Sequence, residues 1–468
     1  MTAAGRLLRL ELRNNVMLWL LPVAGPLFWF VTFRPGLAYP PMWNLRATAM
    51  QTSSLAVFVP LVVGAAAWSG SREGRHGVTE LLAGNARARW ARQFGTWAAT
   101  TCWAIIAYLT CVGVLYAVTA GTAAWGGPLW WPVAVGAASL PAFAALGFTA
   151  GALRPSRFTP AVVAIAAFLA LEISANFIQG FDSHWQVSPL VANPWSLGAD
   201  EGIATFYRYL PDLAIAQILF LAGLTAALMG LLGLPAGAGG SWLRRSATAL
   251  TIVGALCAGT AVALAGTGHL DKNGMIAIPT LHNSAYDRPV PYTPVCSQTP
   301  IPVCVHPAYS RYLPAVVDGL APVLTEVVGL PGAPVRVDQV AAAYEQGSDN
   351  DAGIARSGAA ISGTPPVFNV LLPTQMAHRL SAEELTGEVR VGMARDLVQN
   401  LTGGGRGADD AQEAVTEAMA RTSTLPPGSP VAEAARRFTA LPAATRHAWL
   451  MAHLPALRAG QLTLAELP

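Results

Sequence analysis

Charged residues are scarce in this chain of 468 residues, in which Asp, Glu, Lys and Arg together make up only 12%. An ordinary soluble domain has about 25% charged residues, so the composition excludes a protein that is solvated by water throughout. The scarcity is uneven, because residues 1–267 hold 8 acidic and 15 basic residues whereas residues 268–468 hold 18 and 14. We therefore expect a first half in lipid and a second half in water. The net charge of +3 gives no indication of nucleic-acid binding.

Lysine occurs once, at Lys272, and the common catalytic motifs are missing. A phosphate-binding loop of the form G-x-x-x-x-G-K-[ST] is therefore excluded. Neither the H-E-x-x-H of zinc peptidases nor the G-x-S-x-G of hydrolases occurs. His447 and His453 are six residues apart, on different faces of any helix, and would be poor joint ligands. The sequence predicts no enzyme, no cofactor and no metal site.

Long apolar runs fill the first half instead. A helix needs roughly 20 mostly apolar residues to cross a bilayer, and seven runs qualify: 15–33, 50–68, 95–118, 130–153, 158–180, 212–234 and 248–267. No small-x-small cleavage site follows the first run, so it reads as a retained span. The predicted fold class is an α-helical polytopic membrane protein with about seven transmembrane helices and a C-terminal mixed α/β extracytoplasmic domain. Its expected domains are 1–247 with six spans, 248–267 as the seventh span, and 268–468.

The arginines predict the orientation of these spans. With a cytoplasmic N-terminus, 12 arginines fall in the segments predicted to be cytoplasmic and 3 in the outside loops, namely Arg34, Arg46 and Arg208. The cytoplasmic segments are 1–14, 69–94, 154–157 and 235–247. Arginine and lysine in short loops favour the cytoplasmic side. We expect a multi-pass protein of the cell membrane with residues 268–468 outside the cytoplasm.

Cysteine is rare, and its five positions divide between the halves. Cys102, Cys111 and Cys257 lie in predicted spans, where a thiol is a small apolar filler. Cys296 and Cys304 lie in the predicted outer half, where disulfides persist. A disulfide between them would stabilise the folded domain by about 2.5 kcal/mol, because it closes a short loop in the unfolded chain. A metal pair is the alternative, although the spacing differs from C-x-x-C and no second Cys pair exists.

The predicted outer domain has ordinary globular patterning. We expect a helix around 310–329, strands at 334–340 and 366–372, and two or three helices within 409–458. A helix over 381–403 would begin at a capping box of Ser381 and Glu384 and end at Gly403. Its buried stripe would comprise Leu385, Val389, Met393, Leu397 and Leu401.

The stretch SREGRHGVTELLAGNARARWARQF, residues 71–94, places unusual charge between two predicted spans. The N-terminal RLLRLELRNN alternates charge with leucine, which is typical of a helix lying at the membrane interface. Both features resemble the permease subunits of type 2 ATP-binding-cassette exporters. That family has an interfacial N-terminal helix, six spans and a short coupling helix between spans two and three. Its loop often reads E-R-E-x-G-T-L-E-L-L, followed by a small-Pro-x-x-Arg turn.

The resemblance covers residues 1 to about 234 and implies a site and partners. The matching positions, with the basic run that follows them, are Glu73, Gly77, Glu80, Leu81, Leu82, Arg87 and Arg89. The sequence departs from the pattern at Val78 and Thr79, and Asn85 stands where proline is common. The implied partners are separate ATPase subunits, a second permease copy or a related permease, and membrane lipid. The loop would then couple ATP hydrolysis to transport.

Glu172 lies deep in the fifth predicted span, with Asn176 one turn further on. An ionisable residue there is costly and suggests a translocation path or proton relay. The structural alternative is a protonated Glu that bonds across helices, with Asn176 as polar glue.

A rival function also remains open. The chain could be a membrane-anchored binding or sensory protein whose outer domain recognises a ligand without transport. A membrane-bound hydrolase would require a catalytic constellation that the sequence does not offer.

Overall fold

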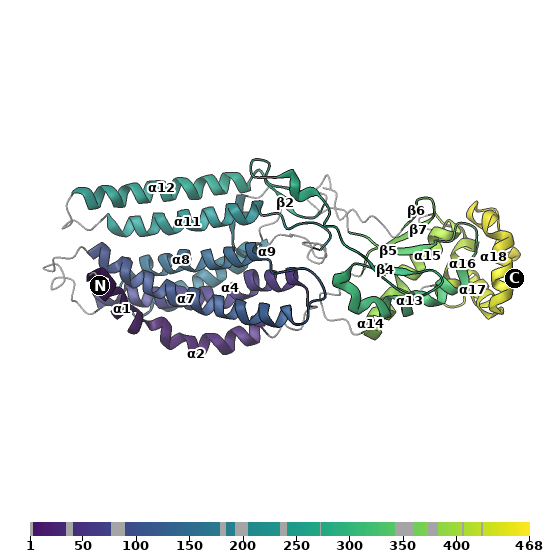
Figure 1. The fold of residues 1–468 in the computed structure, drawn as a ribbon, viewed down its shortest axis with the longest axis horizontal. Coiled ribbons are helices and arrows are strands. Elements are labelled where there is room, and N and C mark those ends of the chain that lie inside the picture. The colour runs from purple at the N-terminus through teal and green to yellow at the C-terminus, as the bar shows by residue number, and fades with distance from the viewer. Residues whose placement is uncertain are drawn as a thin grey trace. The chain divides into compact units, whose positions relative to one another are not determined.

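The computed structural model describes residues 3–33, 41–75, 89–177, 184–191, 205–234, 241–271, 273–341, 360–372, 382–404, 407–422 and 425–468. It divides into two compact units (Figure 1). The first, here called the helical unit, comprises Met1–Pro289. The second, the sheet unit, begins at Val290. Residues 268–289 therefore pack with the helices rather than with the sheet.

Helices build almost all of the helical unit. They are α1 (Ala3–Arg13), α2 (Val16–Phe28), α4 (Trp43–Gly70), α5 (Arg72–Arg75), α7 (Arg89–Ala120), α8 (Trp130–Leu153), α9 (Thr159–Phe177), α11 (Asp212–Gly233) and α12 (Ser241–Ala265). Shorter elements are η1 (Trp29–Phe33), η2 (His184–Val187), β1 (His269–Leu270), β2 (Ile276–Ala277) and η3 (Ser284–Asp287).

Within the described residues, six helices are long and apolar enough to cross a membrane. They correspond to six of the seven predicted runs, and they are Leu8–Thr32, Trp43–Gly70, Arg89–Ala120, Trp130–Leu153, Asp212–Gly233 and Trp242–Ala265. The predicted run 158–180 forms α9, whose apolar stretch Thr159–Ile173 is shorter than the other six. The length and composition of these helices indicate a membrane protein.

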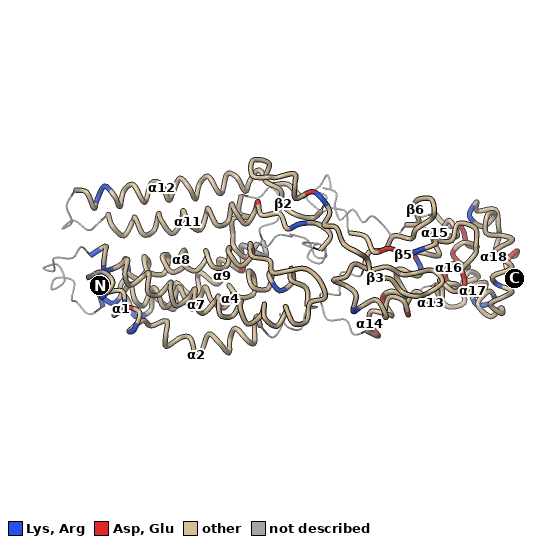
Figure 2. The backbone as a smooth tube through the Cα atoms, viewed as in Figure 1, with Lys and Arg blue, Asp and Glu red and all other residues tan. Residues whose placement is uncertain are grey.

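One end of the helical unit collects the arginines, and it is called the arginine-rich end below. Arg72 of α5 pairs with Glu11 of α1 at 3.0 Å. Trp90, at the start of α7, donates to the Met229 carbonyl near the end of α11 at 2.8 Å. In the described chain this end carries 11 arginines against Glu11 and Glu73 (Figure 2); they are Arg6, Arg9, Arg13, Arg72, Arg75, Arg89, Arg92, Arg154, Arg157, Arg244 and Arg245.

The opposite ends of these helices meet at a second cluster, called the far end. Tyr116 of α7 donates to the Leu129 carbonyl just before α8 at 2.7 Å and stacks edge-on with Trp43 at the start of α4. The Ile278 amide, beyond α12, donates to Asp212 at the start of α11. The chain thus starts at the arginine-rich end with α1 and reaches the far end after α12. With α9 counted, the described helices make seven passes through the bundle.

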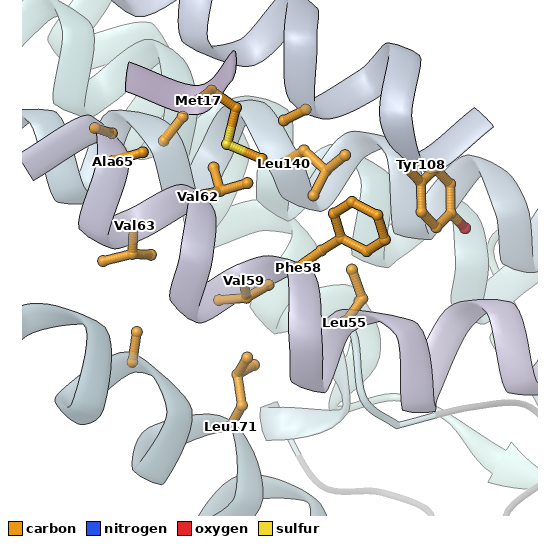
Figure 3. Close-up of a cluster of buried hydrophobic side chains, with 14 of the residues drawn as sticks. Met17, Leu55, Phe58, Val59, Val62, Val63, Ala65, Tyr108, Leu140 and Leu171 are labelled. Atoms are coloured by element: carbon orange, nitrogen blue, oxygen red, sulfur yellow. The ribbon is translucent and has the colours of Figure 1, made fainter. Parts of the chain in front are cut away.

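The middle of the bundle is packed around α4 and α8. In each of these helices 61% of the apolar 18-residue stretch is buried, whereas in α12 the buried share is 17%. Figure 3 shows side chains of α4, among them Leu55, Phe58 and Val62, facing Met17, Tyr108 and Leu140 from three other helices. Glycines allow the closest approach, since a Cβ on Gly147 of α8 would lie 2.3 Å from the Val63 carbonyl oxygen. Small residues at such contacts are typical of helix packing in membranes.

The sheet unit holds a five-stranded mixed sheet in the order β3-β4-β5-β7-β6. The strands are β3 (Val295–Cys296), β4 (Val303–Val305), β5 (Arg336–Gln339), β6 (Ala360–Ser362) and β7 (Val367–Val370). The three central strands are parallel, and both edge strands are antiparallel to their neighbours. Both sequence-predicted strands are present as β5 and β7. The prediction of helices with some sheet in the C-terminal region is confirmed.

Helices of the sheet unit follow the predicted segments with one difference. They are η4 (Pro307–Tyr312), α13 (Leu313–Val327), α14 (Ala382–Val391), α15 (Met393–Thr402), α16 (Asp410–Ala420), α17 (Pro430–Ala440), α18 (Ala443–Arg458) and η6 (Leu464–Glu466). The single helix predicted over 381–403 is divided at Gly392 into α14 and α15. Its predicted stripe is buried throughout, and Gly403 ends α15 with φ 77°. Ser381 of the predicted capping box lies outside the described residues.

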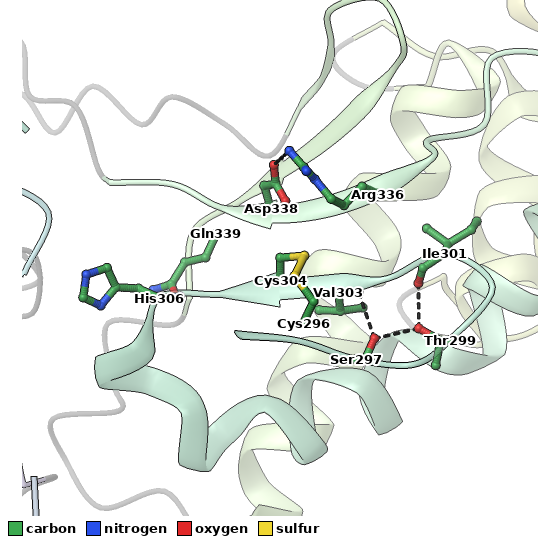
Figure 4. Close-up of a disulfide and its surroundings, with 10 residues drawn as sticks. All are labelled: Cys296, Ser297, Thr299, Ile301, Val303, Cys304, His306, Arg336, Asp338 and Gln339. Atoms are coloured by element: carbon green, nitrogen blue, oxygen red, sulfur yellow. Dashed lines mark hydrogen bonds and ion pairs between the residues drawn. A yellow bond between two sulfur atoms is a disulfide. The ribbon is translucent and has the colours of Figure 1, made fainter. Parts of the chain in front are cut away.

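The predicted disulfide joins Cys296 and Cys304 (Figure 4). The two residues are direct partners across the antiparallel pair β3–β4, with Cα atoms 4.0 Å apart. The Ser297 amide donates to the Val303 carbonyl beside them, which leaves the cysteines at a non-hydrogen-bonded position where side chains are closest. The bond fastens the edge strand β3 to the sheet.

Candidate functional site

The loop between α4 and α7 leaves and re-enters the bundle at the arginine-rich end. Ser71 ends α4, is fully buried, and donates from its hydroxyl to the Trp68 carbonyl. The four residues Arg72–Arg75 then make one short helical turn, α5. Gly74 faces Pro155 of the α8–α9 connection so closely that a Cβ would lie 2.6 Å from the proline ring. The start of the loop is therefore held against two helices of the bundle.

Glu73 ties the two ends of this loop together. One carboxylate oxygen lies 3.3 Å from Nε of Arg89 and the other lies 3.5 Å from Nε of Arg92. Glu73 is 20% exposed and Arg92 is 15% exposed at their side chains, so this pairing is better shielded from water than a surface ion pair. The carboxylate sits between two guanidinium groups of α7, and it fixes where the loop begins relative to where it ends.

The same turn is joined to the N-terminal helix. Arg72 donates to Glu11 of α1, and Trp103 of α7 donates to the Leu12 carbonyl at 2.9 Å. Asn15 caps α2 and donates to Thr100 of α7 at 3.0 Å. A displacement of the loop base would consequently be passed to α1 and α7 together. Because α1 carries leucines and arginines on a strongly amphipathic surface, it fits the predicted interfacial helix.

Arg75 is the last described residue before the gap in the loop, and its side chain contacts α4. Its guanidinium lies 3.7 Å from the centroid of the Trp68 ring and donates to the Trp68 carbonyl at 3.1 Å. A cation over a tryptophan face contributes about 0.5–1 kcal/mol at an exposed site. The loop base is thus braced on both sides of Glu73.

The predicted coupling residues fall into two groups. Glu73 and Arg89, 16 positions apart in the sequence, are brought together as an ion pair. Gly77, Glu80, Leu81, Leu82 and Arg87 lie outside the described residues. Sequence reasoning missed Glu11 and Arg92 as partners; for Glu11, the signal was the single acid among the arginines of the N-terminal segment.

The second predicted site lies on α9. Glu172 is partly buried on this helix, and Asn176 follows one turn later in its backbone. The side chain of Asn176 lies outside the described residues. The suggestion that the two residues line a path or act as polar glue stays a prediction.

The far end holds a polar constellation that the sequence analysis did not predict. Asp212 is 1% exposed, accepts from the Ile278 amide at 3.0 Å, and lies 3.5 Å from Nδ1 of His282. His282 in turn lies 3.2 Å from Asp287. Nearby, burial raises the pKa of Asp271, whose carboxylate accepts from the Asn273 and Met275 amides. These contacts fasten the segment after α12 to the first turn of α11.

Neither a metal site in the described residues nor a known relative indicates the function of the chain. In the described part of the chain no three His, Cys, Asp or Glu side chains gather in a way that could hold a metal ion. No family model matches the chain, and neither a curated protein nor a solved structure matches it.

Proposed function

We propose that this chain is the membrane-spanning permease subunit of an ATP-driven exporter of the type 2 ATP-binding-cassette class. It forms the translocation path with a second permease copy or a related permease. A separate ATPase subunit binds the loop between α4 and α7 from the cytoplasm. The sheet unit lies on the extracytoplasmic side, which agrees with its disulfide.

The observation that carries this proposal is the bracing of the loop base by Glu73. A loop that only orients spans needs positive charge, and a flexible connection would suffice. Here the acidic side chain holds Arg89 and Arg92, and the neighbouring Arg72 holds Glu11. Such bracing suits a segment that must transmit a push from a partner, because rigid contacts move as one body.

Co-purification tests the proposal. The full chain, extracted in mild detergent from its native host, should bring down a nucleotide-binding ATPase subunit. Glu80→Arg should keep expression and membrane insertion but lose the ATPase, since truncating one partner of a buried interfacial charge pair costs about 2–5 kcal/mol. Glu383→Arg, an exposed reversal on α14, is the matched control and should retain the ATPase. Recovery of the ATPase with both variants would reduce the loop to an orientation signal.

An anchored binding protein without transport is the second candidate. It is favoured by the sheet unit, which is compact by itself and contains a cavity of about 610 Å³. The same experiment separates the two functions, because an anchored receptor would bring down no ATPase subunit.

A further inference from the structure

A cavity of the sheet unit lies between α16 and α17, beside Leu425, Pro427 and Gly428 of the chain that connects them. Its volume of about 610 Å³ falls in the range of about 300–1,000 Å³ typical of small-molecule sites. Small and apolar groups line most of it, chiefly Ala418, Leu425, Pro427, Ala432 and Ala435. An apolar lining of this kind can hold the apolar part of a ligand without requiring one particular ligand shape.

Two arginines also line the cavity, and both are held loosely. Arg421 lies 3.3 Å from Glu326 with half of its side chain exposed. Arg436 lies 3.7 Å from Glu433, and both of these side chains are mostly exposed. Exposed pairs of this kind contribute little to stability, so either guanidinium can turn to a ligand at small cost.

Two of the neighbouring carboxylates, Glu326 and Glu417, are already engaged by other groups. The Glu326 oxygen that faces Arg421 is already bonded to the buried Arg446, so one carboxylate serves two guanidiniums. Glu417, the acid in the cavity wall, is 6% exposed and accepts from the Thr422 hydroxyl at 2.8 Å. Its role is to hold the turn after α16. The cavity therefore combines an apolar wall with guanidinium donors suited to an anionic group.

We propose that the cavity between α16 and α17 binds a small amphiphile with an apolar body and a single anionic head group, such as a medium-chain carboxylate. The apolar body packs against the alanines, and the head group takes the hydrogen bonds of Arg421 and Arg436. The site belongs to the sheet unit, so it stands whether or not the helical unit transports a substrate.

Site-resolved photolabelling tests this assignment. The full chain in lipid nanodiscs is irradiated with a diazirine analogue of decanoate, and adducts are mapped by mass spectrometry. We expect adducts on the peptides of α16 and α17, competed by decanoate but not by decanol. Ala435→Trp fills the cavity and should abolish these adducts, while Arg421→Gln with Arg436→Gln should weaken labelling about tenfold.

Arg437→Gln is the matched control, because Arg437 is exposed on the same helix and does not line the cavity. It should label as the wild type does. The arginine variants change exposed side chains, so they keep the test valid even if Ala435→Trp fails to fold. The proposal is wrong if these peptides gain no adducts, if the arginine pair is dispensable, or if decanol competes as well as decanoate.

Discussion

His306 occupies a buried position just after β4, where its side chain acts as a helix cap. Its Nδ1 accepts from the Ala308 amide at 3.1 Å, and its backbone amide donates to Gln339 of β5. Its ring centroid lies 4.2 Å from that of Tyr292. Burial lowers the pKa of His306 from 6.5 to about 4, because an imidazolium would lose its hydration there.

This shift predicts a pH-dependent stability of the sheet unit. Between pH 6.5 and about 4 the unfolded chain binds more protons at this position than the folded chain does, so the free energy of unfolding falls as the pH falls. Between pH 7.5 and 5 the loss should reach about 2 kcal/mol, since one pKa unit corresponds to about 1.4 kcal/mol. Pulse proteolysis of the full chain in urea measures it.

His306→Asn is the matched variant for this measurement. An asparagine can cap Ala308 in the same way but does not titrate. The variant should lose about 2 kcal/mol less than the wild type over the same interval. Equal losses in both proteins would show that His306 is not the responsible group.

For single residues, the sequence predicts which charged side chains belong to the loop site, but it does not predict ion pairs between residues far apart in the chain. Glu73 belongs to the short motif and Arg89 to the basic run that follows it, and the two predicted site residues do pair. Glu11 of α1 and Arg72 of α5 are 61 positions apart, and only the folding of the chain brings them together. Asp212 and His282 are likewise joined across α12, and no local pattern connects such positions.

Among the elements, α11 and α12 pack closely against each other through small residues. A Cβ on Gly254 would lie 2.3 Å from the Ala227 amide nitrogen and 2.6 Å from the Gly223 carbonyl oxygen. Gly259, on the same helix α12, has nothing within 4 Å of the corresponding point. The two glycines thus differ in packing while sharing one helix.

Gly254→Ala should therefore force α11 and α12 apart, at a cost of about 1–3 kcal/mol for overpacking. The melting temperature of the detergent-solubilised chain, followed by size-exclusion chromatography after heating, should fall. Gly259→Ala should melt as the wild type does or slightly higher. If the two variants melt together, the close packing of α11 on α12 is not what stabilises this part of the bundle.

The spacing of apolar residues predicts some features of the helices and strands correctly and misses others. The stripe from Leu385 to Leu401 predicted the buried face correctly, because burial imposes the same spacing before and after a break. The break at Gly392 was missed, since one glycine in a helical pattern is compatible with either outcome. The edge strands β3 and β6 are too short for a periodic signal and form through their neighbours in the sheet.

At the scale of the whole molecule, seven passes place α1 and the chain beyond α12 at opposite ends of the bundle. The arginine excess at the α1 end predicts that this end is cytoplasmic. Protease added to intact cells, or to spheroplasts where an outer membrane is present, should digest the sheet unit and spare an N-terminal tag. Digestion of the sheet unit only after the membrane is breached would require an even number of crossings.

Photo-crosslinking from the loop between α4 and α7 tests whether an ATPase subunit binds this loop. A benzoylphenylalanine at Leu81 should crosslink to one subunit that carries a phosphate-binding loop, identified by mass spectrometry. The matched position is Ala123, in the α7–α8 connection at the far end, which should give no such product. We expect the ATPase subunit to be crosslinked from Leu81 and not from Ala123. No ATPase product from Leu81, or an equal product from Ala123, would contradict this expectation.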